Sequence, residues 1–305
     1  MKKTLYIHAG FHKTGTTSIQ SWCEQNRLAL RSNSIDYIEL GCVGGNHAAY
    51  ALCLQPTLVE QCRKSGFFMG LKDKSRYNYR KHSATILYSA LKEYIESSDN
   101  SKFIISSECF MEGINFIELN KQLSNVSFDI KIIIYLRPQK QWIESVYKYV
   151  VMDKDLRYSG DITQLPQTEM LDFYSQIINF ERLFGKENII LKNYNKSKLN
   201  PFGLIGDFFS TFSHLDFNES TKYSPTNFRE NESFTNFEIM ILNKIWKIER
   251  KTGLRCSSLE KLIYKRAMDK IAYNTLKYDM FFLNDSKYSN NKLFDYFVNF
   301  DSEGF

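Results

Sequence analysis

The chain has 305 residues, of which 43% are hydrophobic and 15% aromatic, enough to bury one large α/β domain or two small ones. This composition excludes a disordered or low-complexity protein. The formal net charge is +6, but no cluster of Lys and Arg with interleaved aromatic residues predicts a nucleic-acid partner, and no stretch approaches the ~18 apolar residues of a membrane helix.

The first predicted element is a buried strand over residues 4–9 (TLYIHA). From Thr16 onward, apolar residues recur near the helical period, so we expect a helix after a short turn. The apolar stretch behind the basic start is too short for a secretory signal. The six cysteines show neither a C-x-x-C pair nor zinc spacing. We therefore expect free thiols, no metal site and a cytoplasmic protein.

Further strands alternate with helical patterns along the chain. The strand candidates are residues 35–40 (IDYIEL), 102–108 (KFIISSE), 129–136 (DIKIIIYL) and 188–194 (NIILKNY). An amphipathic helix is expected at about 170–184, and two more helices at 236–253, which Gly253 would end, and 257–279. Residues 129–136 are apolar on both faces, as a central parallel strand requires. The predicted fold class is α/β, a central parallel sheet flanked by helices, with a helical C-terminal extension.

The turn after the first strand has the glycine spacing of a Walker A phosphate loop, G-x-x-x-x-G-K-[ST], but not its lysine. Gly10 and Gly15 are correctly separated, yet Thr16 follows the second glycine and the only lysine of the loop is Lys13. Such a loop is poorly suited to a β,γ-phosphate with magnesium. It favours an anion with one 5′-phosphoryl unit.

A strand, a glycine turn and a helix present backbone N–H groups and the positive end of the helix dipole to an anion. The hydroxyls of Thr14, Thr16, Thr17 and Ser18 add donors, and Lys13 adds a positive charge. The alternative is a tight turn in which a threonine only caps the helix. The four hydroxyls favour the phosphate interpretation.

A second anchor is predicted where residues 129–136 end. Arg137 lies at the carboxyl end of this strand, the edge at which ligands bind in open α/β sheets. Pro138 suits the first turn of the following helix, and Ser145 lies two helical turns beyond it. A guanidinium and a hydroxyl that converge form a second phosphate site. Taken alone, the pair is better explained as an Arg salt bridge and an ordinary helical Ser.

The segments HKTGTTSIQ and LRPQKQWIESVYK together resemble the motifs of sulfotransferases that use 3′-phosphoadenosine 5′-phosphosulfate (PAPS). The resemblance covers most of residues 1–235. It implies a P-loop-like sulfotransferase fold that needs no metal. The chain would form a single domain over residues 1–305, with a nucleotide-binding core (1–212) followed by a loop and helical extension (213–305). The resemblance also implies two sites. Lys13, Thr14, Gly15, Thr16, Thr17 and Ser18 would bind the 5′-phosphosulfate, Arg137 and Ser145 the 3′-phosphate, and Tyr194 would lie near the nucleotide.

Sulfuryl transfer also needs a general base for the acceptor hydroxyl or amine. Lys13 is the expected contact of the bridging oxygen between sulfur and phosphorus. Glu108 at a strand end and His47 at an expected helix start remain equal candidates for the base, alone or as a pair in which Glu108 orients His47. His12 is expected only to shape the loop.

The expected acceptor is a carbohydrate or a small hydroxyl compound, with residues 65–82 and 213–235 as candidate acceptor loops. A P-loop kinase or NTPase and a non-catalytic nucleotide-binding protein are the alternatives.

Overall fold

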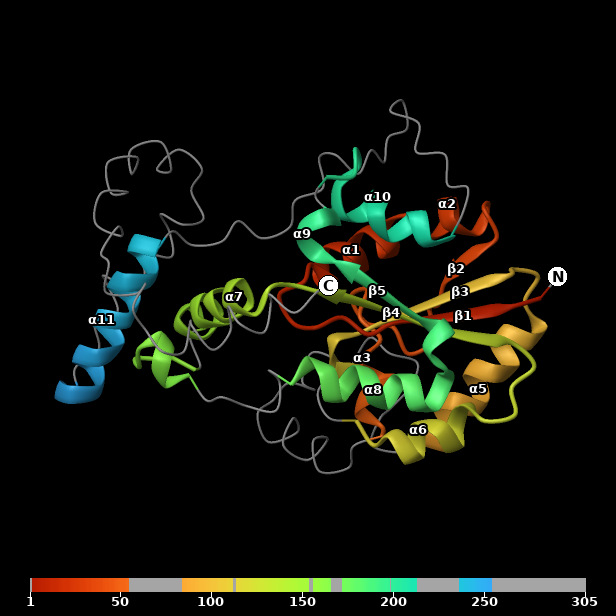
Figure 1. Ribbon diagram of the computed structural model, residues 1–305, viewed down its shortest axis with the longest axis horizontal. Helices are drawn as coiled ribbons and strands as arrows, with labels where there is room; N and C mark the ends of the chain where they lie inside the picture. The colour runs from red at the N-terminus through yellow and green to blue at the C-terminus, as the bar shows by residue number, and fades with distance from the viewer. Residues whose placement is uncertain are drawn as a thin grey trace. The chain divides into compact units, whose positions relative to one another are not determined.

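A computed structural model of the chain describes residues 2–54, 84–111, 114–153, 156–165, 172–197, 199–212 and 236–253 (Figure 1). The chain divides into two compact units. The first consists of Met1–Arg137 with Glu169–Glu230, and the second of Pro138–Thr168 with Asn231–Phe305. The second helix expected near the C-terminus and both candidate acceptor loops lie outside the described residues.

The first unit is built on a five-stranded, fully parallel sheet with the order β2-β3-β1-β4-β5. Its strands are β1 (Thr4–His8), β2 (Ile35–Tyr37), β3 (Lys102–Ser106), β4 (Asp129–Leu136) and β5 (Ile189–Asn193). Each strand falls within a segment that the sequence marked as a strand, because β-branched and apolar residues pack well on a sheet covered on both faces. The predicted α/β class with a central parallel sheet is confirmed.

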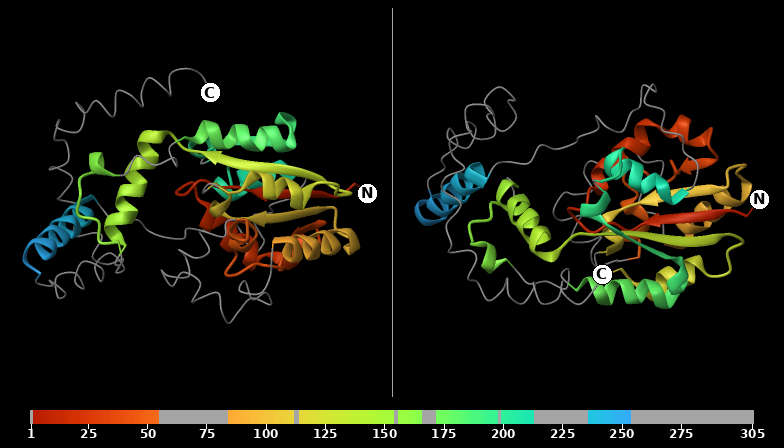
Figure 2. Two further views of the ribbon diagram at one scale, coloured as in Figure 1. Left: turned by 90° about the horizontal axis from the view of Figure 1, so that it is seen from below. Right: turned by 45° about the horizontal axis from the view of Figure 1, so that its top comes forward.

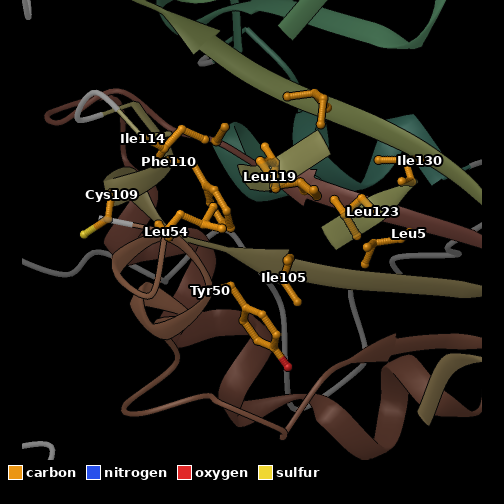
Figure 3. Packing of buried hydrophobic residues seen from close by; sticks show 14 of the residues in the cluster. Leu5, Tyr50, Leu54, Ile105, Cys109, Phe110, Ile114, Leu119, Leu123 and Ile130 are labelled. Carbon is orange, nitrogen blue, oxygen red and sulfur yellow. The ribbon is translucent and has the colours of Figure 1, made fainter. Parts of the chain in front are cut away.

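Helices cover both faces of this sheet (Figures 1 and 2). One face carries α3 (Ala48–Leu52), α5 (Ala84–Ser97), α6 (Phe116–Leu123) and α8 (Phe173–Phe184), whose side chains pack on Leu5 and Ile105 (Figure 3). The opposite face carries α1 (Thr16–Gln25), α2 (Arg27–Arg31) and α10 (Gly203–Phe209) with η6 (Ser210–Phe212), packed on Tyr6 and Ile104. Neighbouring strand residues therefore enter opposite cores, as the two-residue period of a strand requires.

All five strands run in the same direction, so their carboxyl ends meet at one edge of the sheet. β1 leads into the glycine loop, and β3 leads through Ser107 into η2 (Glu108–Met111). β4 ends directly before Arg137. β5, which is preceded by η5 (Lys186–Asn188), leads into α9 (Tyr194–Ser197). Parallel pairing thus collects at one edge most of the residues that the motifs singled out.

The second unit contains α7 (Gln139–Met152), η3 (Ile162–Gln164) and α11 (Asn236–Thr252). α7 and α11 pack through a small apolar cluster around Trp246, whose Nε1–H donates to the carbonyl of Val151 at 2.8 Å. α11 confirms the helix expected before Gly253. α7 lies within the range 1–212 that the sequence analysis expects as the nucleotide-binding core, and it packs with α11. No helix in the described part of the chain has the length and apolar character needed to cross a membrane.

Candidate active site

The loop between β1 and α1 holds two residues in the left-handed region. Lys13 has φ 65° and Gly15 has φ 81°. A non-glycine residue at positive φ costs free energy and occurs preferentially at functional sites. A Cβ added to Gly15 would lie 2.2 Å from Leu204 Cδ2, so the Leu204 side chain would have to move. The positive φ of Gly15 would also strain any L side chain, so this position favours glycine.

The N-terminus of α1 is built to face an anion. No side chain caps it, and its first turn contains no acidic residue. The Thr16 hydroxyl oxygen is buried and has no hydrogen-bond partner among the residues that the structure describes. Thr17 is exposed and Ser18 is half-buried. The backbone N–H groups, the helix dipole and an unused buried hydroxyl together suit a phosphate or sulfate group.

Thr14 has a different role from the one expected. Its hydroxyl donates to the carbonyl of Phe11 at 2.6 Å, and the side chain is fully buried. The hydroxyl proton is therefore used inside the loop, where it ties Thr14 to Phe11.

Lys13 lies within the electrostatic reach of two other candidate residues. Burial is the main cause that lowers the pKa of its ammonium group, and the positive charge of Arg137 lowers it further. The carboxylate of Glu108 acts in the opposite direction. An anion placed near Lys13 and Arg137 would offset both the burial and the repulsion between these cations.

Arg137 joins the loop to α9. Its Nη1 donates to the carbonyl of Lys13 at 3.1 Å, and its guanidinium carbon lies 5.3 Å from the centre of the Tyr194 ring. Arg137 Nε is buried and has no partner among the described residues. Arg137 therefore contacts both Lys13 of the loop and the ring of Tyr194. Ser145 lies half-buried in α7 of the second unit, and its convergence with Arg137 stays a prediction.

The structure corrects the interpretation of His47 as a general base at the rim of the site. The side chain is 0% exposed, and both ring nitrogens bind the backbone. Nδ1 accepts from the Ser106 N–H at 3.1 Å, and Nε2 donates to the Ile38 carbonyl at 2.7 Å. Burial lowers the pKa of His47 to about 3. No ring nitrogen is left for a substrate proton, and Glu108 does not orient the ring.

Glu108 is better placed than His47 to act as a base. It is the first residue of η2 and is half-buried at the carboxyl edge of the sheet. Its Oε2 accepts from Gln20 Nε2 at 3.1 Å and from Asn46 Nδ2 at 3.3 Å. Its charge also acts on Lys13.

Sequence reasoning missed a buried polar group at the end of β1. His8 Nδ1 lies 2.8 Å from Ser106 Oγ, and burial lowers the pKa of His8 to about 3. A Cβ added to Gly10 would lie 2.4 Å from Thr16 Oγ1 and 3.3 Å from His8 Nε2, so both polar atoms border the base of the loop. The available signal was a histidine and a serine at the ends of two apolar strands.

No family model matches the chain. A curated relative, an uncharacterized protein of Archaeoglobus fulgidus, is 29% identical over 208 residues, or 64% of this chain and 53% of that protein. The chain therefore spans about half the length of this relative. A sulfotransferase structure from Alicyclobacillus acidocaldarius has a TM-score of 0.43 and 13% identity, covering 85% of this chain and 99% of that one. A retinol dehydratase in complex with androsterone and the inactive cofactor PAP has a TM-score of 0.31 and 12% identity, covering 83% and 82%.

These low identities and TM-scores carry no argument about activity. Fold and site together define the class: an α/β protein with a glycine loop that contains Lys13 at the carboxyl edge of a parallel sheet. Within the described residues, no three His, Cys, Asp or Glu side chains are grouped to hold a metal ion.

Proposed function

We propose that this protein is a PAPS-dependent sulfotransferase that transfers a sulfuryl group to a hydroxyl or amine of an acceptor. One observation carries the proposal. Lys13, at positive φ in the loop before the uncapped α1, has its carbonyl bound by Arg137 at 3.1 Å, while Thr16 stands where a Walker loop has lysine. The loop thus joins an anion cradle to a second cation and lacks the lysine that grips a nucleoside triphosphate.

In the proposed mechanism, the loop and the N-terminus of α1 hold the 5′-phosphosulfate. The backbone N–H groups of the first helical turn and the hydroxyls of Thr16, Thr17 and Ser18 are the donors. The Lys13 ammonium contacts the bridging oxygen and stabilises the charge that develops there as the sulfur–oxygen bond breaks. PAPS supplies the activated sulfuryl group, and adenosine 3′,5′-bisphosphate (PAP) is the leaving group.

Arg137, Ser145 and Tyr194 are proposed to hold the nucleotide end. Arg137 has an unused buried Nε and lies over the half-buried Tyr194 ring, which supports a role for its guanidinium in binding the 3′-phosphate. Ser145 would add a hydroxyl donor to the same phosphate. This set supports the proposal that the ligand is a nucleotide with a 3′-phosphate as well as a 5′-phosphate.

Glu108 is proposed to accept the proton of the acceptor. The acceptor is proposed to be a carbohydrate, because the half-buried Glu108 carboxylate can accept a hydrogen bond from a sugar hydroxyl. A cytoplasmic location is proposed from the free thiols of the four described cysteines.

Calorimetric titration with PAP, 5′-AMP and Mg-ATP tests the proposal. We expect PAP to bind more tightly than 5′-AMP, by about 10- to 100-fold for one charge-assisted phosphate contact. In Arg137→Ala, PAP and 5′-AMP should bind equally, because the contact to the 3′-phosphate is lost. General damage to the loop would instead weaken the binding of both ligands and keep the preference for PAP. Arg182→Ala, at an exposed position of α8, is the matched control. Preference for Mg-ATP would favour a kinase or NTPase, and equal binding of PAP and 5′-AMP by wild type would refute the proposal.

A further inference from the structure

Both amide donors at Glu108 bind the same carboxylate oxygen. Gln20 Nε2 lies 3.1 Å and Asn46 Nδ2 lies 3.3 Å from Oε2. Within the described part of the chain, no side chain or backbone group donates to Oε1. The two oxygens of Glu108 are therefore unequal: one is held, and the other is available as an acceptor.

Gln20 is itself firmly held. Its side chain is 4% exposed on α1, and Nε2 also lies 3.3 Å from Ser106 Oγ and 3.4 Å from the Ser106 carbonyl. A glutamine amide that reaches Ser106 at the end of β3 and Glu108 two residues later is fixed relative to the sheet edge. Since Gln20 belongs to the helix that begins at the anion loop, it links the loop to the carboxylate.

Asn46 is fixed from the other side. Its backbone exchanges two hydrogen bonds with Val43, at 2.9 and 3.0 Å. The preceding residue, Gly45, has φ 82°, and a Cβ there would lie 2.8 Å from the Gln20 carbonyl oxygen. The segment that carries Asn46 therefore packs directly on α1 at Gln20. The two amides reach Glu108 from elements that are in contact with each other.

We propose that Gln20 and Asn46 are positioning residues that hold Glu108 so that Oε1 accepts the proton of the acceptor. This inference rests on the proposed sulfotransferase function, because it assigns an atom to the base of that reaction. The acceptor O–H bond breaks and its proton passes to Oε1. The acceptor oxygen forms a bond to sulfur, and the bond from sulfur to the 5′-phosphate oxygen breaks with its electron pair leaving on PAP. Holding Oε2 restrains the carboxylate before the reaction, which is the geometric contribution that catalysis requires.

The test compares Gln20→Met, which keeps the side-chain volume but removes the donor, with Gln25→Met at an exposed position of the same helix. The probe is PAPS alone, with water as the acceptor, and the readouts are the rate constant of PAP formation at saturating PAPS and the affinity for PAP. We expect Gln20→Met to lower the rate constant by about 10- to 100-fold, with PAP affinity changed less than about twofold. Gln25→Met should match wild type. Asn46→Leu should show the same pattern as Gln20→Met and serves as the second variant if that protein folds poorly.

A double-mutant cycle separates positioning from a purely structural role. In the Glu108→Gln background, Gln20→Met should cause no further loss of rate, because its effect acts through the carboxylate. The side-chain ¹⁵N–¹H resonances of Gln20 and Asn46 should both move in Glu108→Ala, while that of Gln25 stays in place.

The outcomes distinguish the two proposals. A wild-type protein that neither binds PAP nor cleaves PAPS refutes the sulfotransferase function. A protein that does both, but in which Gln20→Met is harmless or multiplies the loss caused by Glu108→Gln, refutes only the positioning role. The positioning role is also refuted if the side-chain resonances of Gln20 and Asn46 do not shift in Glu108→Ala.

Discussion

The two buried histidines predict that the first unit loses stability in mild acid. His8 and His47 are each 0% exposed, and burial lowers the pKa of each to about 3 from an ordinary value of 6.5. In the unfolded chain both titrate at ~6.5, so between that value and 3 the unfolded state binds more protons than the folded one. The stabilisation is complete above ~6.5 and is lost as the pH falls toward 3.

The size of the effect follows from the two pKa values. Each histidine should cost about 1.4 kcal/mol of unfolding free energy between pH 7.5 and 5.5, and the pair about 3 kcal/mol. This is a large part of the ~5–15 kcal/mol that stabilises a typical domain. The contacts of His47 show why its protonation is unfavourable. Nδ1 accepts a hydrogen bond from the Ser106 N–H, and a proton on Nδ1 would point at that donor.

Urea unfolding followed by circular dichroism at pH 7.5, 6.5 and 5.5 measures this loss. His8→Gln and His47→Gln remove the titrating rings, so each should reduce the loss between pH 7.5 and 5.5 by about 1.4 kcal/mol and the double variant by about 3. Arg182→Ala, on the exposed face of α8, should keep the wild-type pH dependence. If the double variant loses as much stability on acidification as wild type, the reasoning from burial is wrong.

Three further changes test other parts of the molecule. Gly15→Ala should lower the free energy of unfolding by about 1–3 kcal/mol and abolish PAP binding, since the new Cβ at φ 81° would lie 2.2 Å from Leu204 Cδ2. The control is Gly44→Ala, at φ 55° with nothing within 4 Å of the added Cβ. It should show only the cost of the strained backbone and keep PAP binding. Lys13→Ala should lower the rate of PAPS cleavage by about 10²- to 10³-fold. It should reduce PAP affinity much less, because PAP has no bridging oxygen to sulfur. An equal loss of cleavage rate and PAP affinity would contradict the role assigned to Lys13. Trp246→Ala should cost about 3–5 kcal/mol in urea unfolding, as the ring is 2% exposed, and a cost below ~1 kcal/mol would show that the apolar cluster of the second unit is not cooperative.

Local patterns in the sequence were sufficient for the elements of the sheet and for the position of the glycine loop. Each strand is a short apolar, β-branched segment bounded by turn residues, so its identity depends on neighbours in the chain. The segment 129–136 became β4 without a change of bounds. The glycine spacing likewise predicted a turn between the first strand and a helix, and a loop containing Gly10 and Gly15 joins β1 to α1. Such features follow from steric limits within a few residues.

The choice between the two candidate bases was beyond any local pattern. His47 and Glu108 both stand at the end of an element and both are common general bases. They differ through partners that are distant in the sequence: Ser106 contacts His47, whereas Gln20 and Asn46 contact Glu108. The order of the strands brings these segments together, and a sequence pattern does not specify which polar atom faces which after the strands pair.

By itself, the sequence determined where the strands lie, that the sheet is parallel and that a glycine loop precedes the first helix, because these depend on hydrophobic period and allowed backbone angles. Tertiary structure alone decided that the Thr14 hydroxyl closes the loop, that His47 is sealed against the backbone and that one oxygen of Glu108 is held while the other is not. The physical reason is that burial and hydrogen bonding depend on which distant groups share a small volume, and that is fixed only when the sheet has assembled.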